Sequence, residues 1–175
     1  CIARDREVLQ APGVVETPEE PIQTAHQGQR LLHTRKVSIR GADGQPKYLL
    51  GISEDITERR ADENKLLLTA SVFTHAREGI TITDARGVIL DVNGAFTRIT
   101  GYSRDEVLGK TPNLLSSGRH APGFYKDMWR ELLANGQWYG EVWNRRKSGE
   151  VFAEMLNISA VRDAQGKTRN YVALF

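Results

Sequence analysis

Two polar side chains on neighbouring predicted strands are the residues best suited to chemistry in this sequence. Asn144 precedes the basic run at 145–147, and Glu154 lies in the apolar strand after the next turn. If Glu154 faces the interior it needs a partner, because burying an unpaired carboxylate is costly and raises its pKa. With the opposite strand parity Glu154 is an ordinary surface acid. For Asn144, a pocket position and a simple turn contact are equally open.

Two further residues have both a structural and a site interpretation. Trp129 shares near-helical spacing with Tyr125 and Leu132, which is typical of a core position. Thr81 lies among β-branched residues that favour a strand in any case. The loop "GKTPNLLSSG" at 109–118 has the glycines, the helix-breaking proline and the leucines of a segment that lines a pocket.

Residue types that build metal and catalytic centres are sparse. His26, His33 and His75 have no metal-ligand spacing, and His120 lies in "SGRHAP", which predicts an exposed loop. Cys1 is the single cysteine, so neither a disulfide framework nor a cysteine metal cluster can form, and a reducing, cytoplasmic location fits. Because no P-loop, nucleophile elbow or zinc motif occurs, we expect no metal site and no enzyme activity in this chain.

The composition describes a globular chain without a strong electric field. The 24 basic and 22 acidic residues are interleaved and leave a net charge of +2, which predicts neither a nucleic-acid nor an anionic-membrane partner. No apolar run approaches the roughly 20 residues that span a bilayer. With 39% apolar residues, the chain can bury a core.

The order of predicted elements indicates an α+β fold with a mainly antiparallel sheet. Asn93 is placed to cap a helix, and Ser103 with Glu106 matches a capping box. The predicted elements are strands at 79–84 and 88–93, helices at 94–100, 103–108 and about 122–134, a strand at 137–147 and a strand hairpin within 156–175.

A weak internal repeat divides the chain. Residues 36–56 share the hairpin pattern of 156–175, and a probable strand precedes each hairpin, at 13–22 and at 137–147. Only about a dozen residues precede the first copy. We therefore expect a fragment there: three strands without helices, whose apolar face and open edge pair with another chain or pack on the linker.

The segment between the two copies is rich in helix formers. Leu66, Leu67, Ala70 and Phe73 fall on one face of the predicted helix. Such a stripe indicates either packing on the helix's own domain or a short coiled coil.

These motifs together resemble the PAS domain family of bacterial sensory modules. The resemblance rests on "ITITDARGVILDVNGAFTRITGYSRDEVLGK", "WNRRKSGEVFAEMLNISAVRDAQGK" and "GISEDITERR". It implies the C-terminal half of a PAS domain at 1–58, a linker helix at 59–78, and a PAS domain at 79–175 with a five-stranded antiparallel sheet, helices over one face and a cavity between. At the junction, Asp55, Ile56 and Thr57 are implied to couple the first domain to the helix.

Two flavin-binding branches of the family can be compared with 79–175. In a redox-sensing branch known from a nitrogen-fixation regulator, three flavin-contacting positions fall at Thr81, Trp129 and Asn144. In the light-sensing LOV branch, two ring-contacting asparagines fall at Asn144 and Glu154, whereas the reactive cysteine falls at Pro112. The resemblance implies Thr81, Trp129, Asn144 and Glu154 as cofactor-binding residues, and proline excludes a LOV-type adduct at Pro112.

The ligand is left open by the resemblance, since family members hold flavin, haem, a small metabolite or nothing. Pro112 also replaces the carboxylate of the redox branch, and Phe175 replaces a LOV glutamine, so FAD is a candidate and not a conclusion. The loop around His120 argues against haem.

The expected function is that of a sensory module of a signal-transduction protein, which responds to a small ligand or redox state in the 79–175 cavity and signals through the linker helix. The alternative is a ligand-free interaction module that dimerises through the linker helix or the sheet. In that case the pocket is filled by Leu114, Leu115, Phe124 and Trp129. The expected partners are a second copy and an output domain elsewhere in the parent protein.

Overall fold

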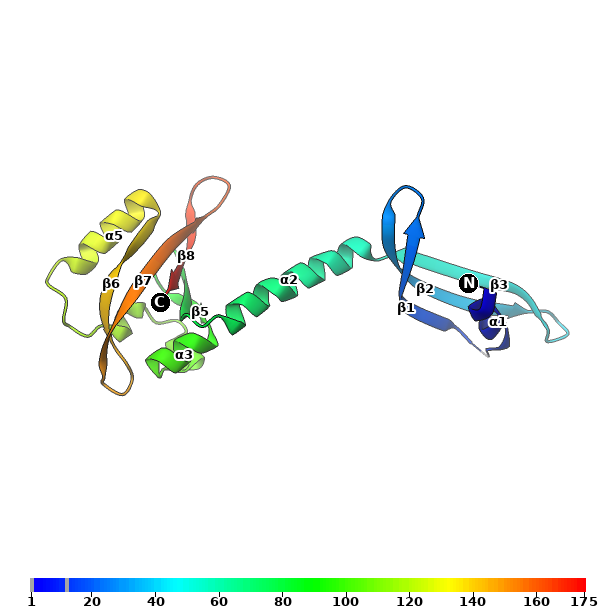
Figure 1. Cartoon of the computed structure of the whole chain (residues 1–175), viewed down its shortest axis with the longest axis horizontal. Coiled ribbons are helices and arrows are strands. Elements are labelled where there is room, and N and C mark those ends of the chain that lie inside the picture. The colour runs from blue at the N-terminus through cyan, green and yellow to red at the C-terminus, as the bar shows by residue number, and fades with distance from the viewer. Residues whose placement is uncertain (1, 12) are drawn as a thin grey trace. The chain divides into compact units, whose positions relative to one another are not determined.

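The chain divides into two compact units, residues 1–68 and 69–175 (Figure 1). The computed structural model describes residues 2–11 and 13–175, with side chains from residue 6 onward. Cys1 lies outside the described residues, so the expectation for it stays a prediction. Helix α2 (Thr57–His75) runs through the boundary of the two units in the sequence.

The second unit is built on a five-stranded antiparallel sheet in the order β5-β4-β8-β7-β6. Its strands are β4 (Ile80–Asp84), β5 (Ile89–Val92), β6 (Gln137–Arg145), β7 (Val151–Arg162) and β8 (Thr168–Leu174). Between β5 and β6 come α3 (Gly94–Thr100), α4 (Arg104–Val107), the 3₁₀ helix η1 (Pro112–Leu115) and α5 (Phe124–Asn135). The predicted α+β fold with an antiparallel sheet is confirmed.

Local sequence signals start the short helices where they were expected. The side chain of Asn93 caps α3 by accepting a hydrogen bond from the Phe96 N–H at 2.9 Å. Ser103 and Glu106 form the predicted capping box on α4. Both caps satisfy N–H groups that a helix cannot pair internally.

Two clusters of buried apolar side chains hold the helices on the sheet. One joins α5 to strands β6, β7 and β8 through Met128, Leu132, Trp138, Val142, Ile158 and Tyr171. The other joins β5 to α3, α4 and η1 through Ile89, Val92, Phe96, Val107 and Leu115. Because each fully buried side chain of this kind is worth roughly 1.5–3 kcal/mol, these clusters fix the helices that position the site.

The first unit contains a three-stranded antiparallel sheet and a helix. Strands β1 (Val15–Thr24), β2 (Gly28–Arg40) and β3 (Pro46–Asp55) pair in the order β1-β2-β3. Helix α1 (Ile2–Gln10) contacts β2 and β3, and its Val8 is only 2% exposed. The expectation of strands without a helix was therefore wrong, because residues 2–10 already form one. The expected open edge is present among the described residues, because β3 pairs only with β2. Every residue of β3 is also exposed.

Helix α2 buries none of its side chains in either unit. Leu66 and Leu67 are 71% and 68% exposed, so the expected packing of this stripe on its own domain is not observed. The helix ends at His75, three residues before the expected boundary of the linker. No helix among the described residues is long and apolar enough to cross a bilayer.

Candidate ligand-binding cavity

A cavity of about 390 Å³ lies in the second unit, between the sheet and the helices. Its walls come from β4 and the turn after it, from the segment around η1, from one face of α5 and from β6, β7 and β8. The apolar lining residues are Pro112, Leu115, Tyr125, Met128, Trp129, Val142, Leu156, Ile158, Tyr171, Ala173 and Phe175, and the polar ones are Thr81, Thr83, Arg86, Thr111, Asn113, Asn144 and Glu154. All four side chains predicted to bind a cofactor therefore line one cavity.

Asn144 and Glu154 meet inside this cavity, which resolves the strand parity left open by the sequence. The Asn144 side chain donates from Nδ2 to Oε1 of Glu154 at 2.8 Å. Asn144 is 8% exposed, and Oε2 of Glu154 is buried without a hydrogen-bond partner among the described residues. Burial raises the pKa of Glu154 to about 7, although the Asn144 hydrogen bond and the charge of Arg146 act in the opposite direction.

Thr81 and Trp129 serve the cavity and the core at once. Thr81 is 3% exposed in the middle of β4, opposite Ala173 of β8. The half-buried Trp129 ring packs edge-on against Tyr171, with centroids 5.3 Å apart. It also lies against Gly87, where an added Cβ would meet the indole at 3.6 Å. The structural and the site interpretations of Trp129 are therefore both supported by its position.

A strap formed by residues 116–120 closes the free edge of β6 beside the cavity, which the sequence did not predict. Ser116 forms a bridge with Asn144, and the Ser117 hydroxyl donates to the Trp143 carbonyl at 2.5 Å. The Trp143 N–H donates to Nε2 of His120 at 2.8 Å. The expectation of an exposed loop at His120 was wrong, because the ring is held between this strand and Phe124, on which it stacks at 3.8 Å.

A family model described as a PAS domain matches residues 77–175. The chain belongs to the PAS domain family. A PAS domain is a sensory module of regulatory proteins, and this is the function class of the chain.

Two curated regulatory proteins are similar to part of this chain. A "Nitrogen fixation regulatory protein" of Klebsiella oxytoca is 36% identical over 104 residues, which cover 59% of this chain and 21% of the relative. A "Blue-light-activated histidine kinase" of Brucella canis is 32% identical over 85 residues, or 49% of this chain and 17% of the relative. The chain thus spans about a fifth of the length of the curated relatives it matches.

Solved structures show the same fold. The PAS domain of a protein from Colwellia psychrerythraea has a TM-score of 0.59 at 20% identity and covers 63% of this chain and 93% of its own. An RNA-binding Light-Oxygen-Voltage receptor has a TM-score of 0.53 at 15% identity, covering 99% of this chain and 80% of its own. At these identities the likeness describes the fold alone.

The beginning of α2 is held to the first unit by the three predicted junction residues. Oδ1 of Asp55 accepts from the Thr57 N–H at 3.0 Å and from its hydroxyl at 2.6 Å, and these bonds lower the pKa of Asp55. The Leu31 N–H donates to Oγ1 of Thr57, while the N–H of the buried Ile56 donates to the Leu31 carbonyl, each at 2.9 Å. This explains why these residue types occur where α2 leaves β3.

The end of α2 is tied to the PAS domain by Asn93, a role that its prediction as a helix cap did not include. Its Nδ2 donates to the carbonyls of Phe73 and Glu78 at 3.1 and 3.0 Å, while Oδ1 also accepts from the Ile80 N–H at 2.9 Å. The side chain is 3% exposed, so these bonds are made away from water. An asparagine after a strand gave the cap signal, whereas the bonds to residues 73 and 78 depend on the tertiary fold.

Phe175 connects the cavity to the segment that follows α2. Its ring lines the cavity, and its backbone exchanges two hydrogen bonds with Gly79, at 2.7 and 3.0 Å. A Cβ at Gly79 would lie 2.6 Å from the ring, so any other residue there would force the ring of Phe175 to move. Gly79 thus contacts a residue of the cavity wall directly, and Asn93 joins the next residue, Ile80, to Phe73 and Glu78.

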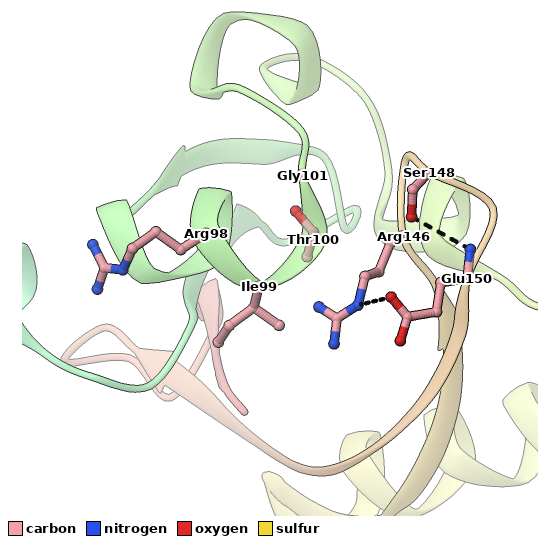
Figure 2. Close-up of a pocket in the computed structure, with 7 residues that line it drawn as sticks. All are labelled: Arg98, Ile99, Thr100, Gly101, Arg146, Ser148 and Glu150. Carbon is pink, nitrogen blue, oxygen red and sulfur yellow. Dashed lines mark hydrogen bonds and ion pairs between the residues drawn. The ribbon is translucent and has the colours of Figure 1, made fainter.

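A second hollow, between α3 and the β6–β7 hairpin, lacks the chemistry of a site (Figure 2). Arg146 is already paired with Glu150 at 3.1 Å and lies over the ring of Phe152. Arg98 points away from that pair, while Ile99 faces it. The charges of Arg146 and Glu150 are therefore already paired with each other, whereas Oε2 of Glu154 has no partner among the described residues.

Proposed function

We propose that residues 77–175 are the ligand-sensing PAS domain of a longer bacterial regulatory protein, and that the ligand is a small planar aromatic compound. The observation that carries the proposal is the cavity itself: aromatic and aliphatic walls surround a single buried hydrogen-bonding pair, Asn144 and Glu154. Ligand sites are commonly apolar cavities with a few polar groups that orient the ligand.

A flavin ring is one ligand that these residues fit. Trp129 and Tyr171 offer aromatic surface, Thr81 and Asn144 offer polar atoms, and the unpartnered Oε2 of Glu154 can accept from a ring N–H. A bound flavin would supply redox chemistry, while the protein would hold and orient the ring. The chain offers no thiol at Pro112 for a light-driven adduct, so the proposal is a non-covalent ligand.

The proposed signal leaves the cavity through Phe175. A ligand against this ring would bias the Phe175–Gly79 pairing, and through Glu78 and Asn93 the end of α2. Such coupling needs two packings of residues 73–79 that differ by a few kcal/mol and a ligand that prefers one of them. Asp55, Ile56 and Thr57 would then pass the change between α2 and the first unit.

We further propose that residues 1–58 are the second half of another PAS domain and that 59–78 act as the signalling linker. The support is the shared order of one helix and three antiparallel strands, in α1 to β3 and in α5 to β8. A second copy of the chain and an output domain of the parent protein are the proposed partners.

A second candidate function, a ligand-free dimerisation module, is favoured by one observation. Helix α2 presents apolar side chains to solvent, at 65–71% exposure, in Leu66, Leu67, Leu68 and Val72. A two-stranded coiled coil would cover such a surface.

Native mass spectrometry of the freshly purified chain tests the sensory proposal. We expect a bound small molecule, and we expect Ala173→Leu, which fills the cavity, to lose it. Ala153→Leu makes the same change at an exposed position of the neighbouring strand and should keep the ligand. A chain that carries no ligand and also fails to bind added lumiflavin, a flavin ring without a phosphate tail, would favour the dimerisation module.

A further inference from the structure

The interior of the cavity contains one charged side chain. Of the lining residues, only Arg86 and Glu154 carry a charge. The Arg86 side chain is 84% exposed at the β4–β5 turn and pairs with Asp84 at 3.2 Å, so its charge stays at the surface. Glu154 alone determines the charge that a buried ligand would meet.

One carboxyl oxygen of Glu154 accepts a hydrogen bond, and the other accepts none from the described residues. Oε1 accepts from Asn144, which fixes the orientation of the group, because the Asn144 backbone is itself bridged to Ser116. Oε2 is buried without a partner among the described residues. A buried carboxylate oxygen in that position is stabilised either by a proton of its own or by a donor that a ligand brings.

We propose that the cavity selects neutral planar ligands that donate an imide or lactam N–H to Oε2 of Glu154. This rests on the proposed function of the cavity. An acidic ligand would place a second negative charge beside the ionised carboxylate, which is unfavourable at low dielectric constant. A ligand N–H would satisfy this buried acceptor, for which the described residues provide no donor.

Ligand binding is then linked to the ionisation of Glu154. The other titratable or charged groups around it are Arg146 beyond the strand end, Arg86 at the rim, and Tyr125 and Tyr171 on the walls. With a pKa of about 7, the ionised fraction of Glu154 rises from about one tenth near pH 6 to about nine tenths near pH 8. The affinity for an N–H donor should therefore rise about tenfold over this range.

Lumiflavin and its N3-methyl derivative provide a matched pair of probes, because they differ only at the imide nitrogen, which carries a hydrogen in one and a methyl group in the other. Their dissociation constants for the full chain can be measured by flavin fluorescence between about pH 6 and pH 8. We expect lumiflavin to bind about tenfold tighter at the higher pH, and the N3-methyl compound to bind at least about tenfold more weakly at that pH. In Glu154→Gln the affinity for lumiflavin should not vary with pH.

The outcomes separate the inference from the function on which it rests. Equal affinity for the two flavins, with no pH dependence, would leave a ring-binding cavity and overturn the role of Glu154. Affinity that falls as pH rises would also overturn it, since the carboxyl would then act as a donor. Absence of binding by either flavin at any pH would overturn the aromatic ligand and the inference together. The comparison of flavins needs only wild-type protein, so it holds even if the Glu154→Gln substitution perturbs folding.

Discussion

The two units of this protein share one half of a fold and differ in whether the other half is present. In both, a helix precedes three antiparallel strands: α1 with β1 to β3, and α5 with β6 to β8. In the second unit β8 also pairs with β4, and α3, α4 and η1 close the space over the sheet. In the first unit β3 has no such neighbour among the described residues, and all of it is exposed.

This difference shows which part of the fold makes the cavity. The shared half can bury a helix on a sheet, as Val8 in α1 and Leu132 in α5 demonstrate. The cavity walls at Thr81 and around Pro112 come from the half that only the second unit has. The helix and three strands are therefore a scaffold, and the site needs the added strands and short helices.

The largest expected effect comes from truncating the buried side chain of the helix that both units share, Val8 in α1 and Leu132 in α5. Leu132→Ala should destabilise the second unit by about 2–5 kcal/mol, because the side chain is fully buried, whereas Val8→Ala removes fewer atoms and should cost the first unit about 2 kcal/mol. Hydrogen exchange resolved by peptide would show each loss in its own unit. If either substitution reduced protection in both units, the two units would not be independently stable, which would contradict this comparison.

Next in size is the effect of cutting the two ends of α2. Asn93→Ala should cost the second unit about 3 kcal/mol, because it removes a cap and leaves buried backbone groups unpaired. Asp55→Ala should speed exchange at the start of α2 with a smaller effect on stability, since Asp55 is exposed.

Asn93→Ser is the matched control for the Asn93 change, because serine is also a favoured N-cap residue and carries no charge. Its shorter side chain keeps an oxygen that can cap α3 and lacks the amide that donates to Phe73 and Glu78, so it should free the end of α2 while α3 remains capped. If Asp55→Ala unfolds the second unit, the junction at Asp55 stabilises the whole chain. That result would contradict the account in which each end of α2 is held by its own unit.

The free energy of unfolding of the second unit should depend on pH through Glu154. Its pKa is raised from the ordinary 4.5 to about 7, so the folded state binds the proton more tightly than the unfolded state. The protonated Glu154 therefore makes its full contribution to the stability of the second unit below pH 4.5, and this contribution is lost as the pH rises through 7. Relative to wild type, Glu154→Gln should gain nothing below pH 4.5 and up to about 3 kcal/mol above pH 7, as measured by urea unfolding. A constant difference across this range would contradict the burial of an unpaired carboxyl.

The smallest expected effect is the opposite pH dependence of Glu106 at the surface of the same unit. The hydrogen bond from Lys147, together with those from Ser103, lowers its pKa from 4.5 to about 2. Its contribution is present above pH 4.5 and is lost as pH falls toward 2. Glu106→Gln should flatten the acid limb of a thermal-melting profile slightly, and an unchanged profile would show that solvent screens the pair.

Much of the second unit could be predicted because its signals are local. The caps at Asn93 and Ser103 are set by neighbours within three residues, and the hairpins by glycine turns. The cavity position of Glu154 could not be decided, because one residue of strand register moves a side chain to the other face. Only the pairing of β6 with β7 settled it.

Other features depended on contacts between distant residues. His120 accepts a hydrogen bond from residue 143, and a loop composition rich in glycine and proline carries no signal for that bond. Helix α1 did have a signal: the run at 6–9, Arg-Glu-Val-Leu, parallels Arg-Glu-Leu-Leu at 130–133 in α5, and the buried Val8 and Leu132 hold the same place.

Hydrogen exchange of the full chain with and without saturating lumiflavin tests the central claim most directly, namely that the cavity communicates with α2 through Phe175 and Gly79. The account predicts that lumiflavin changes protection at the cavity strands and also at residues 73–79, and that Ala173→Leu abolishes both changes. Protection that changes at the cavity strands alone, with residues 73–79 unaffected by a bound ligand, would contradict it.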